Sequence, residues 1–104
     1  TPGQVINLAS FPSEHPGKRS RALVKTPEME VICVNLAAGD ALPPHQVSGP
    51  ITVQCVRGAI SFSVNGVAAE MSAGQWLFLE ADTEHAVEAL EDASILVTIL
   101  FKQS

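Results

Sequence analysis

The segment ISFSVNGVAAEM, residues 60–71, carries the strongest local signal in this chain of 104 residues. Apolar residues occupy every second position from Ile60 to Val64 and again from Val67 to Met71, on either side of Asn65-Gly66. A period of two places the apolar side chains on one face of a strand. Asn-Gly favours a type I′ turn because both central residues need a positive φ. The segment therefore predicts two antiparallel strands joined by a two-residue hairpin.

Further runs along the chain have the length and the β-branched composition of strands. The stronger ones are Met29–Leu36, Ile51–Val56, Trp76–Leu79, His85–Ala89 and Ile95–Phe101, and the weaker ones are Val5–Leu8 and Ala22–Lys25. Turn signals separate most of these runs at intervals of about eight to sixteen residues, which leaves no room for a crossover helix. Residues 85–93 (HAVEALEDA) also fit a short helix, but the flanking strands favour a strand there. The chain is therefore expected to be all-β and antiparallel.

The composition indicates one packed domain over residues 1–104 and limits its partners. A hydrophobic content of 46% with 16% charged residues argues against disorder. The net charge of −5 disfavours nucleic acid, since phosphates require a basic surface. No apolar run reaches the ~20 residues of a membrane span, and the start does not resemble a secretory signal. Cys33 and Cys55 lie in apolar runs and are expected to be buried thiols, so a cytoplasmic location is the expectation.

Two histidines, His45 and His85, stand at the edges of predicted strands, each shortly after a glycine turn. Gly39, His45 and Gly58 have the spacing of one sequence motif of the cupin superfamily, and Gly74 and His85 have that of the other. At these positions the chain resembles the small single-domain cupins of the RmlC-like type. The resemblance implies an antiparallel double-stranded β-helix, or jelly-roll barrel, with both histidines at the barrel mouth.

The chain departs from the first cupin motif at two metal-binding positions. Val47 stands in place of the second histidine ligand and Ile51 in place of the glutamate, which leaves His45 and His85 of the four usual ligands. First-row metals usually take three or more protein ligands. The resemblance therefore implies at most one weakly held divalent transition metal, Zn, Fe, Mn or Ni. Cys55 is either an additional ligand or, as we favour, a buried thiol deeper in the barrel.

The second cupin motif is also incomplete. Glu80 replaces its proline, Asp82 its second glycine and Ala89 its asparagine. With Glu84, these two acids form a cluster just before His85. Such a cluster either raises the pKa of the His85 imidazole or consists of solvent-exposed loop residues without effect on it, and we favour the second interpretation.

We expect a protein that binds a small molecule in the barrel mouth, beside His45, His85, Val47 and Ile51. The alternative is a metal-dependent enzyme of the dioxygenase, isomerase or lyase type that acts on a small polar substrate. The two histidines would then be metal ligands or an acid/base pair. The sequence assigns no catalytic residue. A third hypothesis is an interaction protein that acts through its outer sheet.

A homodimer is expected because a small open barrel leaves edge strands, above all near the N-terminus, that can exchange or pair between subunits. Trp76 is expected in the core or as an interface anchor, since a large amphipathic ring suits both. Gln54 is expected on the outer face of its sheet, and His15 at the surface.

Overall fold

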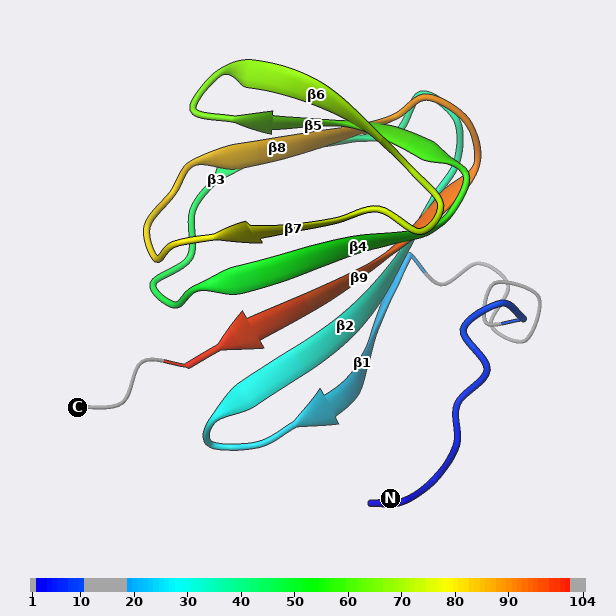
Figure 1. The fold of residues 1–104 in the computed structure, drawn as a ribbon, viewed down its shortest axis with the longest axis vertical. Helices are drawn as coiled ribbons and strands as arrows, with labels where there is room; N and C mark the ends of the chain where they lie inside the picture. Colours follow the sequence, from blue (N-terminus) through cyan, green and yellow to red (C-terminus); the bar gives the residue numbers. More distant parts are fainter. Residues whose placement is uncertain (1, 11–18, 102–104) are drawn as a thin grey trace.

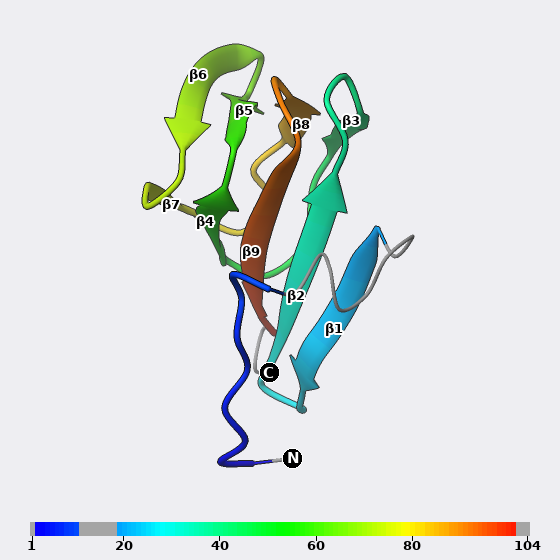
Figure 2. The same ribbon diagram turned by 90° about the vertical axis from the view of Figure 1, so that its right-hand side faces the viewer.

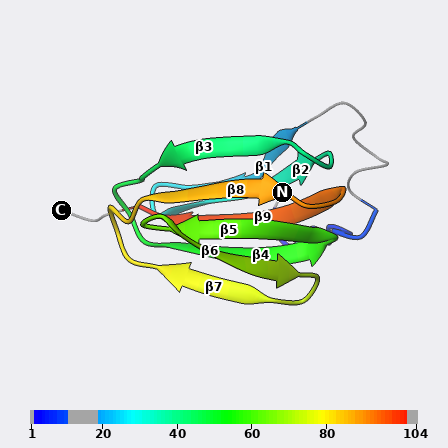
Figure 3. The same ribbon diagram turned by 90° about the horizontal axis from the view of Figure 1, so that it is seen from above.

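Two antiparallel sheets face each other in this computed structural model, which describes residues 2–10 and 19–101 (Figure 1). One sheet has the order β1-β2-β9-β4-β7 and consists of β1 (Ser20–Lys25), β2 (Met29–Leu36), β9 (Ala93–Leu100), β4 (Ile51–Arg57) and β7 (Trp76–Leu79). The other has the order β3-β8-β5-β6 and consists of β3 (Ala41–His45), β8 (His85–Ala89), β5 (Ala59–Val64) and β6 (Val67–Ser72). Figure 2 shows the fold from the side, and Figure 3 shows the four-stranded sheet in front of the other. The predicted all-β jelly roll is confirmed.

The hairpin predicted at Asn65-Gly66 is confirmed. Strands β5 and β6 pair in continuous register from Ala59–Ser72 to Val64–Val67. Both turn residues have positive φ, 49° at Asn65 and 84° at Gly66, as a type I′ turn requires.

The other strand predictions are confirmed, apart from one segment and differences of one or two residues at the ends of β1, β4 and β9. Val5–Leu8 is not a strand, and Val5 is 92% exposed, because the described parts of the chain do not bury one face of this segment. Residues 85–93 form β8, a turn and the first residue of β9, so the strand favoured there over a short helix is confirmed, and β8 pairs with strands on both sides. Strand β9 begins two residues earlier than predicted, at Ala93, because Ala93 pairs with Leu36 of β2.

Strand β3 was missed because its sequence, ALPPH, contains two prolines. Proline has no N–H to donate to a ladder, so it is tolerated mainly on edge strands. Strand β3 is such an edge, since β8 is its one partner among the described strands. Its register shifts between Leu42 and His45, the interval that contains both prolines.

The core lies between the sheets and follows the two-residue alternation of the strands. In β4, Ile51, Val53 and Cys55 are buried, whereas Thr52 and Gln54 alternate with them and are only partly buried. Both cysteines are free and buried, as expected. His15 lies outside the described residues. Within the described residues, no helix is long and apolar enough to cross a membrane.

Candidate functional site

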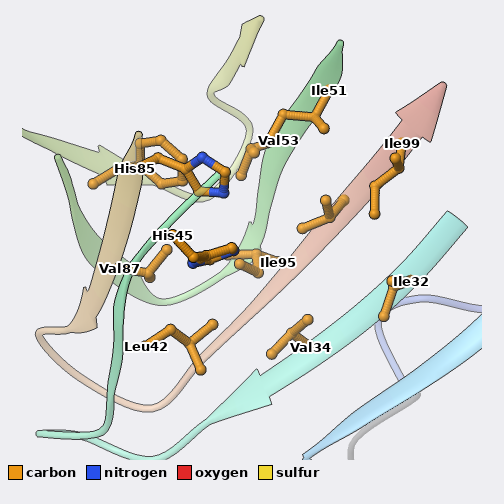
Figure 4. A pocket seen from close by; sticks show the side chains of 12 residues that line it. Ile32, Val34, Leu42, His45, Ile51, Val53, His85, Val87, Ile95 and Ile99 are labelled. Carbon is orange, nitrogen blue, oxygen red and sulfur yellow. The ribbon is translucent and has the colours of Figure 1, made fainter. Parts of the chain in front are cut away.

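His45 and His85 lie side by side because the strand register makes them partners. His45 ends β3, His85 begins β8, and the two residues are directly opposite in the antiparallel pair. Their ring centroids are 4.3 Å apart, with an angle of 62° between the ring planes. The predicted convergence of the two histidines is therefore present in the structure (Figure 4).

The two rings form one end of a cavity of about 140 Å³ between the sheets. The five-stranded sheet lines it with aliphatic side chains from β2 (Ile32, Val34), β4 (Ile51, Val53) and β9 (Ile95, Val97, Ile99). The four-stranded sheet adds Leu42, Phe62 and Val87 to the two histidines. Figure 4 shows the aliphatic side chains of β4, β9 and β2 across the cavity from the imidazoles. Among the residues that the structure describes, no carboxylate, ammonium or guanidinium group lines the cavity.

The backbone holds both imidazoles in the same tautomer. The Nδ1 of His45 is 3.0 Å from the Pro43 carbonyl oxygen, and the Nδ1 of His85 is 3.0 Å from the Thr83 carbonyl oxygen. A carbonyl oxygen can only accept, so each Nδ1 carries the proton and donates it. In the neutral state each Nε2 is therefore an acceptor.

The two histidines differ in burial. His45 is exposed at the rim, whereas His85 is 6% exposed and stacks on Phe62. The His85 and Phe62 ring centroids are 5.7 Å apart, and the ring planes are 7° from parallel. Burial lowers the pKa of His85, and His45 lowers it further, while the hydrogen bond to the Thr83 carbonyl opposes the shift. The hypothesis that the nearby acids raise this pKa is wrong.

The other residues singled out in the sequence lie in different places. Ile51 lines the cavity with the two histidines, but Val47 does not and packs against the core beside it. Cys55 is fully buried, and its thiol lies 3.6 Å from the carbonyl oxygens of Arg57 and Gly58. It is a core thiol and does not line the cavity. Trp76 is 59% exposed, so its placement in the core is wrong.

Solved structures with the same architecture come from several organisms. A conserved protein of unknown function from Streptococcus pyogenes has a TM-score of 0.82 at 19% identity, over 98% of this chain and 90% of that one. A cupin superfamily protein from Desulfitobacterium hafniense has a TM-score of 0.85 at 16% identity, over 96% and 93% of the two chains. An RmlC-like cupin with a double-stranded β-helix fold from Methanocaldococcus jannaschii has a TM-score of 0.73 at 11% identity, over 83% and 84%.

The chain has the cupin fold. Neither a protein-family model nor a curated protein matches its sequence, so the likeness rests on the three-dimensional structures. At these identities the likeness extends to the fold of a cupin and not to any cupin activity.

The metal centre that the cupin resemblance implies does not fit the residues present. Within residues 2–10 and 19–101, no three His, Cys, Asp or Glu side chains gather where they could hold an ion. The cavity offers two imidazoles as donors, while Ile51, which the resemblance aligns with the cupin glutamate, adds only hydrocarbon to the lining. First-row metals generally need at least one more protein donor.

Motif spacing missed the other cavity residues, which are Leu42, Val53, Phe62 and Val87 between the motif positions and the aliphatic residues of β2 and β9. The cupin motifs cover Gly39 to Ala89, so they contain neither β2 nor β9. The signal that could have found these residues is the two-residue alternation, which places every second residue of a strand on the inner face.

Proposed function

We propose that this cupin-fold chain binds a small organic molecule in the cavity between its sheets. The observation that supports the proposal is the placement of two paired imidazoles at one end of an otherwise apolar cavity of about 140 Å³. Ligand sites are typically apolar with a few polar groups that fix the orientation of the ligand. His45 and His85 are those polar groups, and Ile51 is part of the apolar wall.

A screen of small fragments by nuclear magnetic resonance tests this function. Ligands should shift the methyl signals of Ile51, Val53 and Ile95, which line the cavity. Val97→Phe should weaken their binding by at least roughly tenfold, since the larger side chain fills the space. Val67→Phe is the matched control, because Val67 is 74% exposed on the other sheet. A screen that yields no ligand sensitive to Val97→Phe would contradict the proposal.

The metal-dependent enzyme remains the alternative function, and elemental analysis separates it from a binding protein. With two imidazole donors, the purified protein should hold well below one metal ion per chain. A stoichiometric metal that is lost in His45→Ala and in His85→Ala would favour the enzyme and would contradict the conclusion that two imidazoles are too few donors for a first-row metal.

A further inference from the structure

The acceptor character of both imidazoles restricts what the cavity can bind. Each Nδ1 is occupied by a backbone carbonyl, and no partner for either Nε2 is found in the described part of the chain. In that same part, every fully buried side-chain nitrogen or oxygen has a hydrogen-bond partner. The Nε2 of His85 therefore reaches accessible space although the residue is 6% exposed. A ligand must supply a hydrogen-bond donor to this end of the cavity.

The lining also selects against a charged ligand. Ten of the twelve lining side chains are hydrocarbon, and the other two are the histidines. A carboxylate or phosphate would lie in this cavity without a permanent positive charge to pair with it, which is costly in an apolar environment. The buried position of His85 disfavours its protonation, so a histidinium at neutral pH does not supply that charge.

The size of the cavity sets the size of the ligand. An engineered cavity of about 150 Å³, lined by aliphatic and phenylalanine side chains, is known to bind benzene. The cavity here has about 140 Å³ and the same kind of lining. One six-membered ring is therefore the group that fits it.

We propose that the cavity binds an uncharged, single-ring molecule whose hydroxyl group donates a hydrogen bond to the Nε2 of His45 or to that of His85. Phenol is the simplest member of this class. The inference rests on the small-molecule binding proposed above, because it names the class of ligand for the same cavity.

Phenol, toluene and benzoate form a probe set that separates the contributions of shape, donor and charge. Phenol and toluene have nearly the same shape, but only phenol has a donor. In a cavity without acceptors toluene would bind more tightly, since it is the more hydrophobic of the two. We expect phenol to bind at least roughly tenfold more tightly than toluene and than benzoate, as measured by titration of the cavity methyl signals.

Variants of the histidines give a second readout. In His45→Leu with His85→Leu, the preference should reverse so that toluene binds more tightly than phenol. If the double variant does not fold, His45→Leu alone should reduce the preference for phenol, because His45 is exposed at the rim and its replacement is tolerated.

The outcomes distinguish this inference from the proposed function. Toluene or benzoate binding as tightly as phenol, or an unchanged preference in the variants, would overturn the ligand class while leaving small-molecule binding intact. Cavity ligands found in the fragment screen without any binding of phenol would do the same. Only a screen with no cavity ligand at all overturns the binding function itself.

Discussion

His85 links the stability of the fold to pH. Its pKa in the folded protein lies below the ordinary value of 6.5, mainly because the ring is buried. The unfolded chain therefore binds more protons than the folded one once the pH falls below about 6.5, and the free energy of unfolding decreases. We expect stability to be full above this pH and to decline toward pH 5, as measured by urea unfolding across this range.

Substitution isolates the contribution of His85. His85→Gln removes the titrating group, so the decline in stability below pH 6.5 should become shallower than in the wild type. His45→Gln, at the exposed member of the pair, should leave most of the decline in place. Parallel pH profiles for the wild type and His85→Gln would show that other groups control the acid sensitivity.

Position 58 requires a glycine, both because of its backbone conformation and because of the atoms that surround it. Its φ is +78°, and a Cβ at this position would collide with the carbonyl oxygen of Asp92. Gly39 has a similar φ of +88°, but a Cβ there would meet no atom within 4 Å. Gly39→Ala should cost about 1 kcal/mol from backbone strain. Gly58→Ala should cost about 3 kcal/mol because a steric conflict is added. Thermal unfolding of both variants measures the difference, and equal losses would mean that the close approach to Asp92 is unimportant.

At the scale of elements, strand order determines which backbone amides are protected. Strand β9 lies between β2 and β4 and is paired over its whole length, whereas β1 is an outer edge. Amides of β9 should therefore exchange with solvent most slowly and those of β1 among the fastest. Hydrogen exchange followed by nuclear magnetic resonance at low protein concentration tests this order. Protection of β1 equal to that of β9 would contradict the order for an isolated chain.

Patterns that depend on local geometry could be predicted from the sequence, and those that depend on tertiary placement could not. The β5–β6 hairpin was predictable because alternation and Asn-Gly determine strand and turn within a few residues. Strand β3 was not, because only its position at a sheet edge makes Pro43 and Pro44 acceptable in a strand.

In the candidate site, too, local sequence patterns predicted some features, and others depended on tertiary placement. Glycine spacing indicated His45 and His85, and the register of β3 and β8 makes them neighbours. The place of Val47 beside the cavity rather than in its lining depends on the path of the chain between β3 and β4. Motif spacing contains no information on that path.

At the scale of the whole molecule, the outer face of β7 carries an apolar surface suited to self-association. Trp76 is 59% exposed and Phe78 is 50% exposed, and both point away from the core on an edge strand. Large aromatic side chains are enriched in protein interfaces and are seldom left in water together. We propose that two copies of the chain associate through this face, which makes Trp76 an interface anchor.

The dimer can be tested at the proposed contact itself, because Trp76 is the only tryptophan in the chain. Sedimentation should show a dimer at about 100 μM that dissociates on dilution, and the tryptophan emission should shift to the red as the ring becomes exposed. Phe78→Ser should weaken the dimer by at least roughly tenfold, since it removes a large aromatic side chain from the contact. Val67→Ser, on the other sheet, should leave the dimer unchanged. A dimer that persists in Phe78→Ser with no change in tryptophan emission would place the contact elsewhere, with the open edge of β1 as the next candidate.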